Sequence, residues 1–508
     1  MTGAETSGAS RARAAAAIAG AAAVYLALLL FRYRTVPDGL VNDTAEEALR
    51  GLILLDERRA EVLTLVLGNS AETLWLYVVG LSAKLLGPTV LAVALPSALA
   101  AAATAVLVTL LSRALDPGTP WLAPFLLAAG SPWLFHYGRS GLRAISAPLF
   151  FALAALLLAR AAREPARPGP FLWVGAAVGA SLYGYTACRL LPVALVLALA
   201  TAWHADRDRR RAWLRAGGAA GLGFVTASLP NLLFFAAHPH EFLTRGSYVA
   251  VGSGAARFAN LVATLVLPFD TPHRYRFIWG DAHVFDGVSA GLTGSGLDPV
   301  PLATGILFAG GLVWRLARRR DVTTLFLAYT LVLAVALLGP MGPSLTRLFV
   351  ILPVYIVFAS LGAGALMRSP RSRLAVLAGL LLVATQALAR YFSRQSDPSR
   401  DSREYVASVQ TAMGERARAA SANGPVVCVV TESANVVRFL AYGSPVTVVE
   451  FYQRAFDPRE AEPAPAARTL LVEVNPRLAA WRPEGWAEAG GDARFRVLAQ
   501  AVTPRTGP

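Results

Sequence analysis

Long apolar runs constrain this chain more than any other feature of its sequence. A run of about 20 apolar residues crosses the hydrocarbon core of a bilayer as a helix. Of the 508 residues, 55% are hydrophobic and only 16% are charged, which predicts a polytopic membrane protein. The runs expected to span the bilayer are residues 14–31, 89–111, 121–137, 143–160, 171–187, 189–204, 217–237, 300–316, 322–340, 346–366 and 374–391.

Arginine residues gather in four short blocks between these runs. Short loops rich in arginine stay in the cytoplasm, so each block predicts a cytoplasmic loop. The net charge of +15 therefore reflects membrane topology, and we exclude nucleic acid as a partner. The blocks are Arg160, Arg163 and Arg167; Arg207, Arg209, Arg210, Arg211 and Arg215; Arg315, Arg318, Arg319 and Arg320; and Arg368, Arg371 and Arg373.

Counting spans back from these loops places position 87 outside, and with the tail 1–14 expected in the cytoplasm, residues 33–88 begin and end outside. The apolar stretch 74–86 then does not cross, since at about 1.5 Å per residue it reaches only about 20 Å. We expect an amphipathic interfacial helix there, with Trp75 and Tyr77 at the head groups and Lys84 snorkelling. The predicted fold is all-α and polytopic, with 11 to 12 transmembrane helices. The membrane domain covers residues 15–391, with outer loops at 33–88 and 238–299.

The tail 398–508 changes composition and predicts a small α/β domain outside the cytoplasm. Helical and strand-like stretches alternate along it. It contains neither a glycine-rich phosphate loop nor the spacing of a catalytic triad, so we expect an accessory domain without catalytic residues. Cys188 and Cys428 are far apart and lack metal-ligand spacing, which indicates packing residues. The expected elements are helices at 403–420 and 434–442 and strands at 426–430, 446–451, 470–474 and 495–502.

Acidic residues cluster directly after the first apolar run. Asp43, Glu46 and Glu47 stand at i, i+3 and i+4, and hence on one face of a helix. A carboxylate-rich segment beside the membrane is a candidate catalytic site. One alternative is structural, with Asp43 capping the helix and Glu46 reaching back to it. Glu72 is either an acid favoured by the start of the next helix or a functional partner of Asp43.

Arginines at the expected outer ends of the spans run against the positive-inside bias and predict a bound anion. Each lies in a turn between two spans. Anchoring at the interface by snorkelling is the alternative for the first two. With the acidic segments, these turns are expected to gather acids and arginines on the outer face. The candidate phosphate- and substrate-binding residues are Arg139, Arg143, Tyr183, Tyr185, Arg189 and Arg347.

The outer loop 238–299 contains several histidines and carboxylates, among them His283. Imidazole and carboxylate groups suit divalent metals. No two of these histidines stand at the i, i+4 spacing of a helix, so a metal site is not favoured. We expect the loop instead to close over a substrate and to supply polar contacts, with His283 as a candidate.

The order of these motifs resembles the GT-C superfamily of polytopic membrane glycosyltransferases, of the protein O-mannosyltransferase and aminoarabinose transferase type (glycosyltransferase 39-like). An acid follows the first helix, and a short glutamate-led helix ends in Leu86-Gly87. A Ser-Pro turn ends in Tyr-x-Arg, and Tyr-x-Tyr-Thr-x-x-Arg and Pro-Ser-x-x-Arg turns follow. The resemblance covers residues 15–391 and leaves out the C-terminal tail.

The resemblance implies an inverting glycosyltransferase of the bacterial inner membrane. It would move a sugar from a polyprenyl-phosphate donor to a protein, lipid or polysaccharide acceptor on the outer face. Asp43 would match the general base and Glu72 the second acid. The usual Asp-Glu motif is here Asp43-Thr44, which leaves open whether Glu46 or Glu47 assists.

No cofactor is implied with certainty. Near Arg139 the sequence lacks the aspartate that metal-dependent members of the superfamily carry. Dependence on a divalent metal is therefore not favoured by the resemblance either.

The residue chemistry agrees with a transferase. Displacement at a sugar carbon needs a carboxylate to accept a proton and cations to hold the departing phosphate. One alternative is a transporter or flippase of a lipid-linked sugar, although its charges should lie near the middle of spans. Another is a non-catalytic protein of cell-envelope assembly.

Overall fold

The computed structural model describes residues 2–66, 69–241, 254–270, 299–341, 345–396, 407–451, 467–475, 486–491 and 494–500, with 478, 481 and 483. The chain divides into two compact units. Unit 1 comprises Met1–Phe31, Ala60–Trp75 and Pro96–Arg400, and unit 2 comprises Arg32–Arg59, Leu76–Leu95 and Asp401–Pro508.

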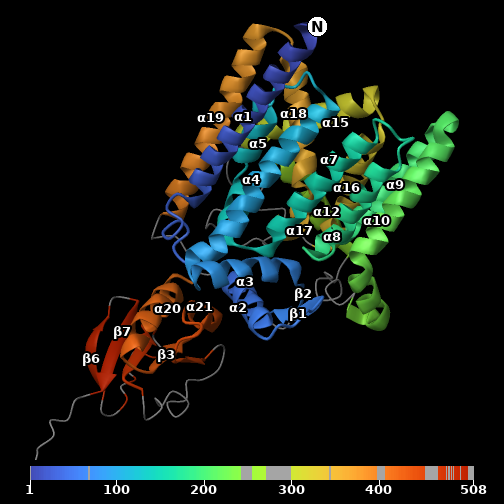
Figure 1. The fold of residues 1–508 in the computed structure, drawn as a ribbon. Coiled ribbons are helices and arrows are strands. Elements are labelled where there is room, and N and C mark those ends of the chain that lie inside the picture. Colours follow the sequence, from blue (N-terminus) through green and yellow to red (C-terminus); the bar gives the residue numbers. More distant parts are fainter. Residues whose placement is uncertain are drawn as a thin grey trace, which may run out of the picture. The chain divides into compact units, whose positions relative to one another are not determined.

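Unit 1 is a bundle of mostly apolar helices (Figure 1). Seven helices in the described part of the chain are long and apolar enough to cross a membrane, and each predicted span lies in a helix or a short series of helices. The helices are α1 (Thr2–Leu30), α4 (Val90–Leu115), α5 (Leu122–Ala129), α6 (Pro132–Ser140), α7 (Ser146–Ala161), α8 (Gly169–Ser181), α9 (Leu190–Ala205), α10 (Arg210–Ala237), α12 (Gly254–Asp270), α15 (Pro299–Arg318), α16 (Val322–Leu338), α17 (Leu345–Leu348), α18 (Leu352–Leu366) and α19 (Pro370–Gln395).

One predicted span, 121–137, is broken in two. Helix α5 ends before Gly130, and α6 begins at Pro132, which suits the first turn of a helix because proline has no N–H to pair. Ser131 caps α6 by accepting a hydrogen bond from the Leu134 N–H at 3.4 Å. Gly141 ends α6 with a φ of +83°, a left-handed conformation that glycine adopts without strain. Arg139 lies in the last turn of α6, and Arg143 begins the 3-10 turn that follows Gly141.

Glycines allow close helix packing in unit 1. A Cβ atom at Gly175 of α8 would lie 1.8 Å from the carbonyl oxygen of Ala220 in α10. A Cβ atom at Gly311 of α15 would lie 1.8 Å from the carbonyl oxygen of Phe358 in α18. Such contact between backbones is how membrane helices associate where burial from water gives no driving force.

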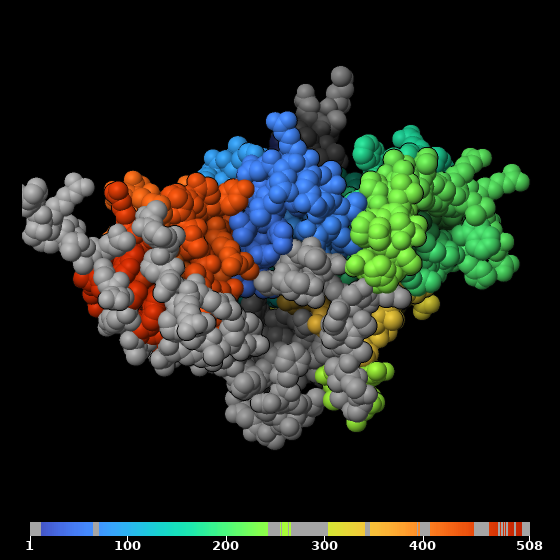
Figure 2. Space-filling view, turned by 90° about the horizontal axis from the view of Figure 1, so that it is seen from below, coloured from blue at the N-terminus to red at the C-terminus, as the bar shows by residue number. Residues whose placement is uncertain are grey.

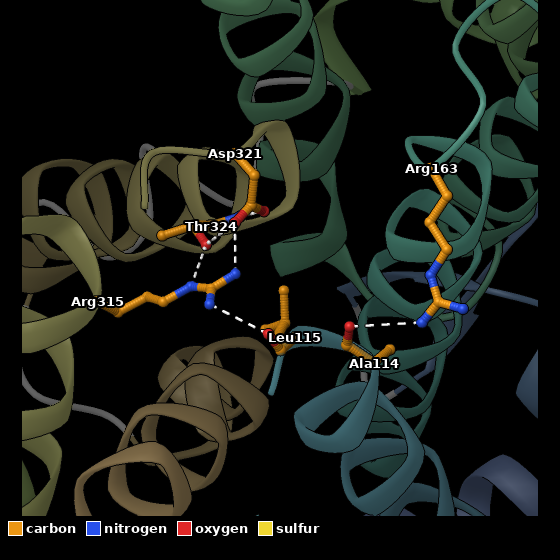
Figure 3. A network of polar contacts seen from close by, with 6 residues as sticks. All are labelled: Ala114, Leu115, Arg163, Arg315, Asp321 and Thr324. Atoms are coloured by element: carbon orange, nitrogen blue, oxygen red, sulfur yellow. Dashed lines mark hydrogen bonds and ion pairs between the residues drawn. The ribbon is translucent and has the colours of Figure 1, made fainter. Parts of the chain in front are cut away.

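Two arginines from the predicted cytoplasmic blocks bind the C-terminal end of α4 (Figure 3). Arg315 donates to the carbonyl of Leu115 at 3.1 Å and to Thr324 Oγ1 at 3.0 Å, and it pairs with Asp321. Arg163 reaches the carbonyl of Ala114 at 3.5 Å. Carbonyls in the last turn of a helix have no partner within it, and they favour positive charge. Arg315, which is buried, therefore has a structural role in addition to its value as a topology signal.

Unit 2 contains a five-stranded sheet with the order β4-β3-β5-β7-β6. Strands β4, β3 and β5 are parallel, whereas β7 pairs antiparallel with both β5 and β6. In Figure 2 the described residues of this C-terminal domain are coloured from orange to red in the order of the sequence. Its elements are α20 (Ser408–Ala420), β3 (Val426–Val430), α21 (Ala434–Leu440), β4 (Val446–Glu450), β5 (Thr469–Glu473), β6 (Trp486–Gly491) and β7 (Phe495–Gln500).

Strand β3 is buried on both faces, as expected of a parallel strand covered on each side. Met413, Cys428 and Val437 belong to one core cluster, and Val427 and Leu470 belong to another. Both cysteines of the chain are free and buried, and Cys428 is a packing residue of the first cluster. The predicted fold class, a polytopic helical protein with a small C-terminal α/β domain, is confirmed.

The same unit contains two helices from the N-terminal part of the chain, α2 (Asn42–Asp56) and most of α3 (Leu74–Leu86). The limits of α3 are those predicted for the interfacial helix. Two side chains differ from the prediction, because Trp75 is buried and Lys84 forms an ion pair with Asp56 at 2.7 Å.

Candidate functional site

Glu72 is the last residue of a β-hairpin in unit 1. Strands β1 (Leu63–Val66) and β2 (Asn69–Glu72) pair antiparallel, with Leu63 opposite Glu72, and α3 begins two residues later at Leu74. The side chain of Glu72 is only 1% exposed. A buried carboxylate is costly unless charged or hydrogen-bonding groups compensate it.

Thr186 and Arg189 compensate this carboxylate. Thr186 Oγ1 donates to Glu72 Oε1 at 2.6 Å, and a guanidinium nitrogen of Arg189 lies 3.3 Å from the same oxygen. Both residues belong to the 3-10 turn η2 (Thr186–Arg189). Side chains three residues apart eclipse one another in a 3-10 helix, so this turn directs both groups to one point. The Arg189 guanidinium also lies 5.0 Å from the centroid of the Phe235 ring.

The residues that follow Glu72 bind two of the arginine-bearing turns. The N–H of Leu74 donates to the carbonyl of Tyr183 at 3.2 Å. The indole Nε1 of Trp75 donates to the carbonyl of Gly141 at 3.1 Å. The segment 72–75 therefore links the Tyr183–Arg189 turn to the turn between Arg139 and Arg143.

The remaining turns meet at the same place. Arg143, in the turn η1 (Arg143–Ile145), is buried and lies 5.9 Å from the centroid of the buried Tyr185 ring. The hydroxyls of Tyr137 and Thr346 are 2.5 Å apart, and α17, which carries Arg347, contacts η2. The structure thus brings together Glu72 and the turns of Arg143, Arg189 and Arg347.

Tyr183 has a structural role. Its hydroxyl accepts a hydrogen bond from the backbone N–H of Asn231 at 3.3 Å, and its carbonyl accepts from Leu74. It therefore ties the turn of Arg189 to both α10 and the start of α3.

Arg139 binds the end of α1. Its guanidinium donates to the carbonyls of Leu28 at 3.0 Å, Leu29 at 2.5 Å and Phe31 at 2.7 Å. It also lies over the ring of Phe392 at 5.1 Å. The guanidinium therefore caps a helix in the way that Arg315 does, a role that the sequence analysis did not consider.

The other acidic candidates lie on α2 in unit 2. Asp43 is exposed in the first turn, whereas Glu46 and Glu47 are buried and Glu46 pairs with Arg50 at 3.3 Å. The N-cap residue is Val41, so the alternative in which Asp43 caps the helix is wrong. A carboxylate in the first turn is still favoured by the helix dipole.

His283 lies outside the described residues, so its role stays a prediction. Within the described ranges no group of three or more His, Cys, Asp and Glu side chains could hold a metal ion.

Thr186 is the site residue that the sequence analysis missed. It stood within the Tyr-x-Tyr-Thr-x-x-Arg motif, three residues before Arg189. That spacing in a short turn was a usable signal, because it aligns two side chains on one edge of a 3-10 helix.

Comparison with known proteins gives one family match. Residues 73–207, about a quarter of the chain, match the family model of dolichyl-phosphate-mannose-protein mannosyltransferase. The matched segment contains Arg139, Arg143, Tyr183, Tyr185 and Arg189. None of the curated proteins matches the chain.

Together with the fold, this match confirms that the chain has the architecture of a GT-C superfamily membrane glycosyltransferase. The structure of ArnT from Cupriavidus metallidurans bound to undecaprenyl phosphate is similar, with a TM-score of 0.63 and 12% identity over 96% of this chain and 98% of ArnT. The apo state of the same ArnT has a TM-score of 0.60 and 13% identity over 95% and 98% of the two chains.

Proposed function

We propose that the protein is an inverting glycosyltransferase of the bacterial inner membrane. It would transfer a sugar from a polyprenyl-phosphate carrier to an acceptor on the outer face. The observation that supports this most is the meeting of the Arg143, Arg189 and Arg347 turns around the buried Glu72. Guanidinium groups bind phosphate through charge-assisted, bidentate hydrogen bonds, which suits an anionic ligand.

A phosphate leaving group explains why cations would accelerate the reaction. The donor phosphate is a diester with a charge of about −1, and after transfer it is a monoester with a charge of about −1.5 to −2 at neutral pH. The phosphate therefore gains negative charge as the bond breaks. Guanidinium groups bind it more strongly in the transition state than in the ground state, which is the condition for catalysis.

The proposed transfer is a single displacement. The acceptor oxygen attacks the anomeric carbon from the side opposite the phosphate and forms the new glycosidic bond. The bond from this carbon to the phosphate oxygen breaks, and its electron pair leaves with the carrier phosphate. Asp43 accepts the proton of the acceptor hydroxyl. Inversion at the anomeric carbon follows from this direction of attack.

Glu72 is proposed to position Arg189. It is buried and hydrogen-bonded to Thr186, whereas Asp43 is exposed and better suited to meet a diffusing acceptor. A guanidinium has five N–H donors in a fixed plane, so one edge can bind a carboxylate while another binds phosphate. Arg143, Tyr185 and Arg347 would complete the phosphate site, and Glu46 and Glu47 would support Asp43.

A polyprenyl carrier agrees with the similarity to ArnT, which was crystallised with undecaprenyl phosphate. The carrier's tail would stay in lipid while its phosphate reaches the arginines. The topology predicted from the arginine blocks favours transfer on the outer face.

Substitution of Asp43 tests the proposal. Cells lacking the protein should accumulate lipid-linked sugar, measured by mass spectrometry, and the parent gene should restore its consumption. Asp43→Asn should lower glycan product about 100-fold or more at normal membrane levels, because general-base catalysis contributes at least that factor. Asp38→Asn, another exposed acid before α2, is the matched control and should behave as the parent.

The two alternative functions predict other outcomes. A flippase would move the lipid-linked sugar across vesicle membranes without releasing polyprenyl phosphate. An assembly protein would give unchanged glycan product with Asp43→Asn. Either result would count against the transferase.

A further inference from the structure

The backbone of Leu40 is paired with the C-terminal domain. The N–H of Ala407 donates to the carbonyl of Leu40 at 2.8 Å, which forms an isolated antiparallel bridge. The N–H of Leu40 donates to Thr411 Oγ1 at 3.0 Å. Both polar backbone groups of Leu40, two residues before α2, are thus satisfied by one domain that lies far along the sequence.

Side chains extend this contact to both ends of the segment. Before α2, Arg34 pairs with Glu415 of α20 at 3.0 Å. At the end of α2, Tyr442 donates to Asp56 Oδ2 at 2.7 Å. The pKa of Asp56 is lowered because Lys84 and Tyr442 both donate to its carboxylate. Helix α21 of the domain packs against α2.

The fit between these segments is close. Gly39 has a φ of +118°, and a Cβ atom there would lie 2.9 Å from the Cα of Ser408. On α2 itself, a Cβ atom at Gly51 would lie 2.0 Å from the carbonyl oxygen of Leu76 in α3. Helix α2 is therefore tied to the C-terminal domain and packs closely against α3.

We infer that the C-terminal domain is a positioning element for α2 and thereby sets the orientation of Asp43. This inference depends on the proposed function, in which Asp43 is the general base. A general base acts only within hydrogen-bond reach of the proton that it accepts. Asp43 lies three residues after Leu40, so loss of the contacts at Leu40 displaces the first turn of α2.

Thr411→Val tests this inference, and Thr431→Val is its matched control. Both threonines are 8% exposed and lie in the C-terminal domain. Thr411 binds Leu40, whereas Thr431 donates to Glu473 within the domain at 2.8 Å. Each variant of the full-length protein is compared with the parent by thermal unfolding, by hydrogen exchange of the α2 amides, and by kcat and the donor KM.

Thr411→Val should increase exchange in α2 and lower kcat about tenfold with an unchanged donor KM, since a small misplacement of a reacting group lowers rate steeply. Tyr442→Phe should act in the same direction from the other end of α2. Thr431→Val should lower thermal stability alone. Equal exchange and equal kcat for Thr411→Val and Thr431→Val would overturn the inference. An inactive parent protein would overturn the proposed function, and the exchange comparison would still decide whether the domain holds α2.

Discussion

Glu72 and Arg189 lie far apart in sequence and form an ion pair in the interior of the protein. Removing two charges from water costs more than their attraction returns in many proteins, so such a pair is weak evidence for stability. We therefore connect it with function. The sequence predicted both residues as candidates but missed Thr186, which stands in the same motif as Arg189. It could not predict the pairing with Glu72, because 114 and 117 positions separate the partners.

Substitution of this pair should separate stability from activity. Glu72→Gln leaves the Arg189 charge without its buried counter-charge and should destabilise the protein by about 3 kcal/mol. The double substitution Glu72→Gln with Arg189→Gln should recover most of this stability but no transferase activity. Thermal unfolding and product formation measure the two effects. Recovered activity in the double variant would remove Arg189 from the proposed phosphate site.

Arg139 should behave differently from Arg189. Arg139→Gln removes a charged donor from three carbonyls near the end of α1 and should destabilise the protein by about 2 kcal/mol. Activity per folded molecule should remain, since this guanidinium caps a helix. Arg189→Lys should show the reverse, with normal unfolding and reduced kcat, because lysine cannot form a planar bidentate contact with phosphate. A large loss of kcat with Arg139→Gln would return Arg139 to the phosphate site.

At the scale of elements, the sequence predicted most helices because apolar runs of membrane length have few alternatives. The predicted limits of the strands were close to the observed ones, and the predicted strand 426–430 has the same limits as β3. Strand β6 was missed because Trp486–Gly491 has neither an apolar run nor β-branched residues. The break between α5 and α6 was missed because it depends on Gly130 and Ser131, whose hydropathy does not interrupt the run.

Helix packing gives a prediction with a matched pair of glycines. Gly175→Ala places a Cβ atom 1.8 Å from the Ala220 carbonyl and should separate α8 from α10. We expect destabilisation of about 1 to 3 kcal/mol by overpacking. Gly221→Ala on α10 meets nothing within 4 Å and should leave thermal unfolding unchanged or raise its midpoint. Similar midpoints for the two variants would contradict close contact between these helices.

At the scale of the whole molecule, composition separated the C-terminal tail from the membrane helices. It gave no sign that residues 32–59 and 76–95 belong to the same compact unit as that tail. The reason is physical, since contacts such as that between Leu40 and Ala407 depend on backbone hydrogen bonds, which any residue except proline can donate. The predicted sidedness of the loops is a separate matter and depends on charge counting alone.

Cysteine labelling tests this sidedness. The native thiols give little background, because both are buried and burial raises the pKa of Cys428 to about 12. Glu488→Cys, at an exposed position of β6, should react with a membrane-impermeant maleimide in spheroplasts. Arg209→Cys, exposed in a predicted cytoplasmic loop, should react only after permeabilisation. The opposite labelling pattern would show that the predicted topology is inverted, and it would exclude transfer on the outer face.

Lys84, the partner of Asp56, is the single lysine of the sequence, and 51% of its side chain is exposed. Reagents that acylate primary amines therefore find one side-chain target in the entire protein. A fluorophore attached there would report from α3 without any engineered residue. The emission of such a dye during turnover would show whether this helix changes its surroundings as donor arrives and product departs.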